Sequence, residues 1–355
     1  LLASGWTCSK AGVDGGTLLT YKRTSNGATF SILLEKVAST DLKLTSGAEL
    51  PLIQGTDDKD VITVRGGNNS IMVVGGKGND ALTVLGDITG GTYKLYGTAG
   101  ADTIAVAGIA GGVTDLEAEK ITTGEISGGQ TSLAGDAVVV TKVSGGSLLL
   151  QGGDTSAAHR FTLGDVSNAR VTLQGGASAN TLYMGNIAGS TVSVMGGTGN
   201  EAFHVGNISG STISLSGGEG MDSLYFDGSS AVHLALRSGT KPGAGIILDG
   251  IDVIHGTGLS DYLDATNYMT AAIIDGGNGN DTLVGSWGQT LTGGKGDDLL
   301  IVTALNGITA IGGVGNDTFS LESLTASSTY TLSGNSLNAS SGSATLQEME
   351  NIRLS

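Results

Sequence analysis

The chain is poor in cysteine, proline, aromatic and charged residues, and the first two shortages each exclude a class of protein. Of its 355 residues, one is cysteine, two are proline, 4% are aromatic and 14% are charged. The single Cys8 excludes an internal disulfide framework. Scarce proline excludes a collagen triple helix, which also requires glycine at every third position. No apolar run approaches the roughly 18 residues of a membrane helix, so we expect no membrane insertion.

Basic residues are scarce as well. The chain has 17 Lys and Arg against 33 Asp and Glu, which gives a formal net charge of −16. Such a chain lacks the basic patch that nucleic-acid binding requires, and it needs counter-cations to limit its own repulsion. The basic residues are spread out, and no long inserted loop gathers them with acids. Because general acid–base catalysis needs such a cluster, we expect that the protein is not an enzyme.

Glycine, in contrast, is abundant and periodic. It contributes 62 residues, about 17% of the chain, where average usage is about 7%. The hexapeptide Gly-Gly-x-Gly-x-Asp occurs at 75–80, 276–281, 293–298 and 312–317, with partial copies at 55–60, 97–102, 217–222 and 256–261. Neighbouring copies repeat at about 20 residues, a period typical of repeat architectures. We interpret the longer gap between Asp222 and Asp261 as about two periods.

Short alternations of apolar and polar residues lie between these loops. Clear examples are 181–184, 191–195, 202–205 and 212–216. Alternation with a period of two predicts β-strands, and only 115–120 and 346–349 resemble brief helices. Two strands and two glycine-rich corners form one coil, and stacked coils pair every strand with those above and below. The sequence predicts an all-β fold, a parallel β-solenoid of about 20 residues per coil with the glycine-rich loops on one side.

The two ends of the chain lack the hexapeptide. We expect residues 1–50 to form an N-terminal β cap or assembly segment, residues 51–325 to form the solenoid, and residues 326–355 to form a C-terminal coil or strand cap. The chain starts Leu1-Leu2 without an initiator Met or a visible signal peptide, so we interpret it as part of a longer product.

The loops have the chemistry of a calcium site. Calcium prefers six to eight oxygen ligands, and a tight glycine loop turns backbone carbonyls inward. One carboxylate per loop, repeated one coil later, places two carboxylates near each other, and a cation between them relieves their repulsion. Plain turns without metal are the alternative. The four histidines are scattered without the spacing of a zinc site, and we expect them on strands or at the surface.

These hexapeptides resemble the nonapeptide repeats of the repeats-in-toxin (RTX) family, which read Gly-Gly-x-Gly-x-Asp-x-Leu-x. The resemblance implies a calcium-dependent β-roll that a Gram-negative bacterium exports in one step and that folds outside the cell, free or on the cell surface. It implies Ca²⁺ as the bound ion. The implied ligands are the carboxylates of Asp60, Asp80, Asp102, Asp222, Asp261, Asp281, Asp298 and Asp317, with loop carbonyls around Gly76, Gly78, Gly277, Gly279, Gly294, Gly296, Gly313 and Gly315.

The chain also departs from that family. RTX rolls carry calcium loops on both sides, whereas this chain has them on one side. In this respect it is similar to the one-sided solenoids of bacterial surface-layer, filament and adhesin proteins. Asn180 and Glu201 stand where the motif has Asp, so calcium at those coils is doubtful.

We therefore expect an extracellular, calcium-stabilised structural protein that self-assembles into a surface layer, filament or biofilm. Its main partner is then a second copy of itself, and a cell-surface polysaccharide is a further candidate. Two alternatives remain open: a calcium-rigidified segment of a bacterial adhesin, and the RTX module of a secreted enzyme or toxin. We expect Trp6 and Trp287 to be packing residues rather than sugar platforms, and Cys8 to be a small buried residue or a thiol near a flexible end.

Overall fold

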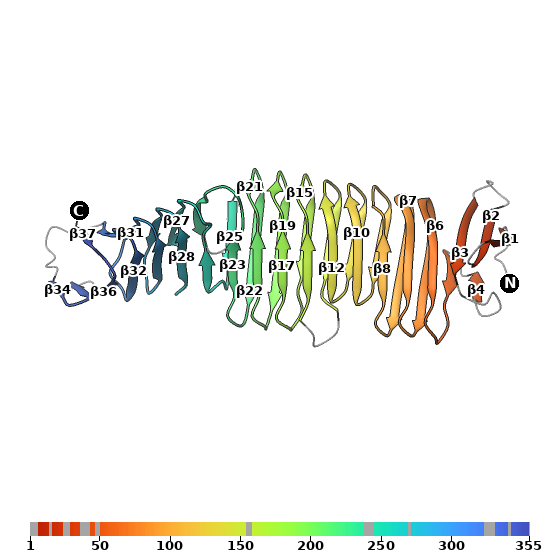
Figure 1. Ribbon diagram of the computed structural model, residues 1–355, viewed down its shortest axis with the longest axis horizontal. Helices are drawn as coiled ribbons and strands as arrows, with labels where there is room; N and C mark the ends of the chain where they lie inside the picture. Colours follow the sequence, from red (N-terminus) through yellow and green to blue (C-terminus); the bar gives the residue numbers. More distant parts are fainter. Residues whose placement is uncertain are drawn as a thin grey trace. The chain divides into compact units, whose positions relative to one another are not determined.

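The computed structural model describes residues 6–13, 16–23, 29–35, 43–46, 50–153, 158–237, 245–268, 271–322, 331–339 and 342–354, and no side chain before residue 50. The described residues form strands, turns and no helix. The chain divides into two compact units, Leu1–Gly176 and Ala177–Ser355. Within each unit the strands lie side by side in coils (Figure 1).

The strands of the first unit are β1 (Trp6–Val13), β2 (Gly16–Arg23), β3 (Thr29–Glu35), β4 (Lys43–Ser46), β5 (Pro51–Gln54), β6 (Val61–Lys77), β7 (Ala81–Ala99), β8 (Thr103–Val106), β9 (Val113–Glu117), β10 (Lys120–Ile126), β11 (Gln130–Ala134), β12 (Ala137–Val143), β13 (Ser147–Gln151), β14 (Arg160–Leu163), β15 (Val166–Ser167) and β16 (Arg170–Gln174). The first strands pair antiparallel, as β1–β2, β2–β3 and β3–β6. From β6 on, the strands described within this unit pair in parallel, for example β6–β7, β7–β8, β10–β12 and β12–β14.

Three stacks of buried residues form the core of the first unit, one on each face of the coil. One stack runs through Leu82, Ile104, Ile121 and Val138. A second contains Ile88, Ile109 and Ile126, joined by single bridges, and the third contains Leu95, Leu116, Leu133 and Leu150. All of these side chains are buried. Because alternate residues of a strand point inward, the period-two pattern places them in the core.

The strands of the second unit are β17 (Thr181–Met184), β18 (Ile187–Ala188), β19 (Thr191–Gly197), β20 (Ala202–Val205), β21 (Ile208–Ser209), β22 (Thr212–Gly218), β23 (Ser223–Phe226), β24 (His233–Arg237), β25 (Gly245–Asp249), β26 (Val253–His255), β27 (Tyr262–Asn267), β28 (Ile273–Asn278), β29 (Thr282–Gly285), β30 (Thr290–Lys295), β31 (Leu299–Val302), β32 (Ile308–Val314), β33 (Thr318–Leu321), β34 (Thr331–Ser333), β35 (Ser336–Ala339), β36 (Gly342–Gln347) and β37 (Asn351–Leu354).

The second unit contains coils of two kinds. Its first coils have three strands, as in β17–β18–β19, because a buried Ile in the Gly-Asn-Ile corner adds a short third strand. From β26 to β33, each coil has two strands, such as β28 and β29, which continue into β30 and β31. After β33, strands β34, β35 and β36 pair antiparallel before β37. The expected two-strand coil is therefore right only for the second kind. The expected pair of periods between Asp222 and Asp261 is wrong, because Asp222 meets Asp252 across a single long coil of 30 residues.

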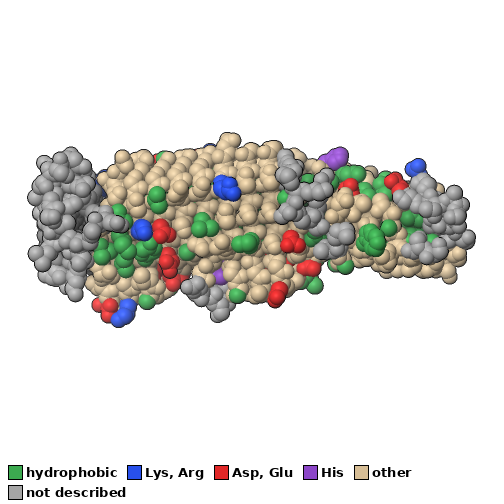
Figure 2. Space-filling model, turned by 180° about the vertical axis from the view of Figure 1, so that it is seen from behind, with side chains coloured by type: hydrophobic (Ala, Val, Ile, Leu, Met, Phe, Trp, Pro, Cys, Tyr) green, Lys and Arg blue, Asp and Glu red, His purple; other side chains and the backbone are tan. Residues whose placement is uncertain are grey.

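The predicted fold class is confirmed: the chain is an all-β parallel β-solenoid with about 21 residues per coil. The two brief helices are wrong, because Asp115 lies in β9 and Leu346 in β36. None of the described residues belongs to a helix that is long and apolar enough to cross a membrane. Figure 2 shows that basic side chains are sparse on the visible face. The predicted domain limits at residues 50 and 325 stay predictions, as do the side-chain roles of Cys8 and Trp6, which lie outside the described side chains.

Candidate functional site

The sixth-position aspartates of the loops are buried, with at most 4% of each exposed. In the first unit they form a row that runs from coil to coil. The backbone N–H of Asp60 donates to Asp80 Oδ1 at 2.8 Å, and that of Asp80 donates to Asp102 Oδ1 at 2.7 Å. The N–H of Asp102 then donates to Glu119 Oε2 at 2.6 Å. Each carboxylate therefore satisfies a buried amide of the preceding coil.

The second unit holds two such rows. In one, the N–H of Glu201 donates to Asp222 Oδ1 at 2.7 Å, and that of Asp222 donates to Asp252 Oδ2 at 2.8 Å. The other row joins Asp261, Asp281, Asp298, Asp317 and Glu350 through N–H to carboxylate bonds of 2.7 to 2.9 Å. The long coil separates the rows, because β23 follows its loop whereas its partner β26 precedes the next loop. The eight predicted aspartates thus belong to three rows.

The first glycine of each loop makes room for the carboxylate of the same loop. A Cβ on Gly293 would lie 2.3 Å from Asp298 Oδ2 and 2.6 Å from the carbonyl oxygen of Gly312, one coil on. A Cβ on Gly276 would lie 2.3 Å from Asp281 Oδ2. No real Cβ fits at such distances. The pairing of glycine at the first position with an acid at the sixth is therefore a packing requirement.

The predicted second- and fourth-position glycines have left-handed backbones and touch the preceding coil. Their φ values are 115° for Gly76, 113° for Gly78, 100° for Gly277, 115° for Gly279, 110° for Gly294, 131° for Gly296, 108° for Gly313 and 158° for Gly315. A Cβ on Gly294 would lie 2.1 Å from the carbonyl oxygen of Gly277, and one on Gly296 would lie 1.9 Å from that of Gly279. Only glycine combines this φ with this approach.

The fifth position forms an outer row that runs in the opposite direction. The N–H of Ala101 donates to Asn79 Oδ1, that of Met221 to Asn200 Oδ1, and that of Asp297 to Asn280 Oδ1, each at 3.0 Å. The Asn-Asp pair of the motif therefore ties neighbouring coils by hydrogen bonds alone. This accounts for part of the motif without any metal.

In most sixth-position carboxylates, the second oxygen accepts no hydrogen bond from the residues that the structure describes. Within the described residues, Oδ2 has no hydrogen-bond partner in Asp80, Asp102, Asp222, Asp281, Asp298 and Asp317, and it is buried in each. Asp60 and Asp261 differ, because the N–H groups of Thr56 and Thr257 donate to their Oδ2 atoms at 2.6 Å. A buried carboxylate oxygen without a donor is destabilising while it is charged.

Burial accordingly raises the pKa of five of these acids. Loss of solvation raises the pKa of Asp281 to about 7, and the charges of Asp298 and Asp261 contribute. The pKa values of Asp80, Asp102, Asp298 and Asp317 rise for the same main reason. A proton or a cation on the second oxygen removes the unfavourable charge. The rows are therefore places where a proton or a cation would be favourable.

The donor set at the loops fits a hard cation. It consists of carboxylate and carbonyl oxygens, which suit calcium and not softer metals. No three His, Cys, Asp or Glu side chains gather into a metal-binding group in the part of the chain that the structure describes. Loop carbonyls must therefore supply most ligands. Some of these carbonyls already accept inter-coil hydrogen bonds: the N–H of Lys77 donates to the carbonyl oxygen of Thr56, and that of Gly78 to the carbonyl oxygen of Ala99.

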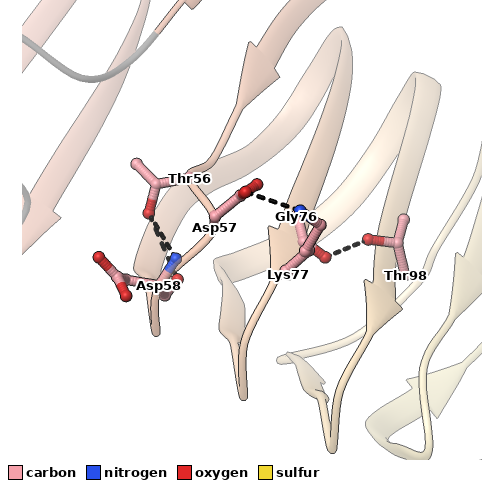
Figure 3. Close-up of polar contacts among 6 residues, drawn as sticks. All are labelled: Thr56, Asp57, Asp58, Gly76, Lys77 and Thr98. Atoms are coloured by element: carbon pink, nitrogen blue, oxygen red, sulfur yellow. Dashed lines mark hydrogen bonds and ion pairs between the residues drawn. The ribbon is translucent and has the colours of Figure 1, made fainter.

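A surface groove of about 490 Å³ lies over the first three loops, between Gln54 and Ala99. Figure 3 shows Thr56, Lys77 and Thr98 on neighbouring coils. Lys77 Nζ lies 2.7 Å from Asp57 Oδ2, and both side chains are largely exposed. Thr98 has a φ of 86° at the second loop position, where other loops have Gly76, Gly277, Gly294 and Gly313 at positive φ, and its hydroxyl donates to the carbonyl oxygen of Gly76. That backbone is strained for a β-branched residue.

The two coils that depart from the motif use another solution. Asn180 Nδ2 donates to Glu201 Oε1 at 3.2 Å. The side-chain N–H of Asn180 therefore offsets part of the negative charge of the Glu201 carboxylate. Two acids at this place would need a cation between them. Burial, followed by the contact with Asp222, raises the pKa of Glu201. Oε2 of Glu201 remains buried without a hydrogen-bond partner among the described residues, so a proton or a cation is favourable at this oxygen as it is at the aspartates.

Sequence reasoning missed several members of this structure. Glu119, Asp252 and Glu350 extend the rows, although no glycine motif precedes them; coil-to-coil register reveals them.

Sequence reasoning also missed a stack of aromatic rings on the second unit. Tyr183, His204, Tyr225 and His255 stack with centroids 4.4 to 4.6 Å apart and planes within 15° of parallel. Asp227 Oδ2 accepts a hydrogen bond from the His204 ring at Nδ1 at 2.8 Å, and Asp275 Oδ2 accepts one from the His255 ring at Nδ1 at 2.9 Å.

Comparison with known proteins does not assign the chain to a family. A scan against protein-family models gives no match, and a search of curated proteins finds no similar chain. The likeness to RTX repeats therefore depends on the hexapeptides and on the solenoid, which is compatible with an RTX-like β-roll.

Proposed function

We propose that the protein is an extracellular, calcium-stabilised structural protein that assembles with copies of itself into a surface layer or filament. The observation that carries this proposal is the set of buried carboxylate oxygens without a donor, repeated from coil to coil. A folded chain with this many uncompensated buried acids is unstable at neutral pH unless cations compensate them. Outside a cell, millimolar calcium is the cation that fits such oxygens.

The residues that would hold calcium are the eight sixth-position aspartates, with carbonyls of the glycine loops. Among the described residues, the strongest members share a buried Oδ2 without a donor and a carboxylate neighbour on both sides; they are Asp80, Asp102, Asp222, Asp281, Asp298 and Asp317. Asp60 and Asp261 are the weakest, because Thr56 and Thr257 already donate to Oδ2. When bound, calcium supplies charge compensation and links neighbouring coils.

The structural role is supported by how the chain is used. Most described residues belong to coil strands or to the loops between them. The flat outer faces of stacked parallel strands offer repeated surfaces for copies of the chain. Secretion by a Gram-negative bacterium and a location at its surface are part of the same proposal, because the cytosol keeps calcium too low to fill such sites.

A calcium titration tests the proposal. Far-ultraviolet circular dichroism and light scattering are recorded together while EDTA and then excess calcium are added. We expect the chelator to remove both the β signal and the large particles, and calcium to restore both. If the β signal persists while particles disappear, calcium acts between molecules. A protein whose β signal and particle size both ignore calcium would refute the proposal.

A matched pair of variants makes the test specific. D298N replaces a buried row member, and D297N replaces its exposed neighbour, whose Oδ1 accepts the N–H of Asn316 at 3.0 Å. Asn retains an Oδ1 acceptor in both. We expect D298N to require more calcium for folding and D297N to behave as the natural chain. Equal calcium requirements for the two variants would mean that net charge, rather than the row, governs the response.

A further inference from the structure

Trp287 is exposed, although the sequence favoured a packing role. Its exposed fraction is 59%. It lies in the turn Ser286–Gln289 between β29 and β30, at the corner of the coil opposite the glycine loops. Trp287 and Gly288 have φ values of 48° and 72°, and the N–H of Gln289 approaches the carbonyl oxygen of Ser286 at 3.4 Å. Two successive residues with positive φ are typical of a type I′ turn.

The residue type at this position is unusual. The first central position of a type I′ turn favours Asn, Asp or Gly, because a left-handed backbone strains other residues by about 1–2 kcal/mol. Single exposed apolar residues need no explanation on a protein surface. A tryptophan held at positive φ is different, because the chain presents the indole at the expense of turn stability. Strained residues of this kind are concentrated at functional sites.

A buried glutamine fixes the turn from inside. Gln289 is fully buried, and its Oε1 accepts the N–H of Ser286 at 2.9 Å. Its Nε2 donates to the carbonyl oxygens of Ala265 and Tyr268 at 3.0 and 2.6 Å. One side chain therefore joins the Trp287 turn to the turn of the preceding coil. The backbone beneath the indole is rigid before any ligand binds, which reduces the entropy that binding must overcome.

The neighbouring corners provide polar groups without charge. The preceding turn follows Asn267, which ends β27, and the following turn carries Asn306; both residues are exposed. Both turns are adjacent to the Trp287 turn. Ser286 Oγ lies 3.4 Å from the carbonyl oxygen of Thr266, and the N–H of Thr303 donates to the carbonyl oxygen of Gly285 at 3.0 Å. An aromatic face beside amide groups suits a sugar ring, which has apolar C–H faces and hydroxyls at its edge.

The other aromatic side chains of the second unit are less suited to this role. Tyr183, His204, Tyr225 and His255 stack on one another, so their inner ring faces are covered. Trp287 alone of the two tryptophans has a described side chain. We propose that the Ser286–Gln289 turn is a carbohydrate contact in which the Trp287 indole stacks on a pyranose ring and the amide of Asn306 binds its hydroxyls. This site does not depend on the calcium proposal.

Tryptophan fluorescence tests the site directly. In a W6F variant Trp287 is the sole tryptophan, and its emission and iodide quenching are followed during titration with cellohexaose, chitohexaose and dextran in calcium buffer. We expect at least one of these probes to shift the emission and protect the indole from iodide. Affinity is then measured by calorimetry. W287A is expected to bind at least tenfold more weakly, since interface anchors of this type contribute that much or more.

Two controls keep the result interpretable. W287F retains an aromatic face and is expected to bind between W287A and the natural chain, which also covers the case in which W287A folds poorly. M221A removes a side chain that is 64% exposed elsewhere in the same unit, and its binding is expected to be unchanged. Unchanged binding in W287A, or no response to any probe, overturns the proposal. A fluorescence change on dilution without sugar identifies Trp287 as a contact between copies and also overturns it.

Discussion

Replacing Asp281 by Asn separates the charge of a row carboxylate from its hydrogen bonding. The N–H of Asp261 donates to Asp281 Oδ1 at 2.7 Å, and an Asn side chain can retain that acceptor. The change removes the charge from the buried Oδ2, which has no donor of its own among the described residues. D281A removes both the charge and the acceptor, so the two variants distinguish the two contributions.

The magnitude follows from the pKa of Asp281. Burial raises it from 3.8 to about 7, and each pKa unit corresponds to about 1.4 kcal/mol. The folded chain retains a proton that the unfolded chain releases above about pH 4, so the free energy of unfolding falls as pH rises to about 7. The upper limit of that loss is about 4 kcal/mol, and relaxation of the loop lowers it. We expect D281N to be about 1–3 kcal/mol more stable than the natural chain at about pH 8 in EDTA.

Calcium reverses the order. A ligand at 100 times its Kd stabilises the folded chain by about 2.7 kcal/mol per site, and D281N lacks the charged ligand. Urea unfolding at about pH 8, followed by circular dichroism with EDTA and with calcium, measures both effects. If the natural chain is unfolded in EDTA, a pH titration from the acid side replaces urea, and D281N should unfold at the higher pH. A D281N chain that is less stable in EDTA, or that retains the full calcium response, would refute this account.

Three further predictions follow from the loops. G293A places a Cβ 2.3 Å from Asp298 Oδ2 and should lower the free energy of unfolding by more than about 2 kcal/mol. The control G86A places a Cβ that meets no atom within 4 Å and should lower the free energy of unfolding by only about 1 kcal/mol. Equal shifts in the melting temperatures of the two variants would contradict the packing argument. T98G removes the backbone strain of a φ of 86° and loses one hydrogen bond. We expect the free energy of unfolding, measured by denaturant, to increase by up to about 1 kcal/mol. A clear decrease would show that the hydrogen bond of the hydroxyl outweighs the strain. Burial raises the pKa values of Asp80, Asp102, Asp298 and Asp317. The protein in chelator should therefore lose stability as the pH rises above about 4, and its calcium affinity should increase over the same pH range. Calorimetric calcium titrations that give the same affinity at every pH would contradict this prediction.

The sequence by itself determined the class of fold. Strict alternation, as in 202–205 and 212–216, allows only strands with one buried face, and a period near 20 residues brings equivalent residues into neighbouring coils. The positions of the loop glycines and acids were also readable, because positive φ and close backbone approach admit only glycine. These are local requirements, and each loop expresses them within six residues.

Tertiary structure decided what depends on register. The long coil after Asp222 moves the loops to another corner, so one apparent series of aspartates becomes separate rows. Glu119 and Glu350 join rows without any motif, because the pairing of strands rather than the local sequence brings them there. The same holds for Trp287: only the Gln289 side chain, bonded to carbonyls of the preceding coil, shows that its turn is rigid. Contacts between residues 17 to 33 positions apart depend on the length of every coil between them, and spacing alone does not provide that length.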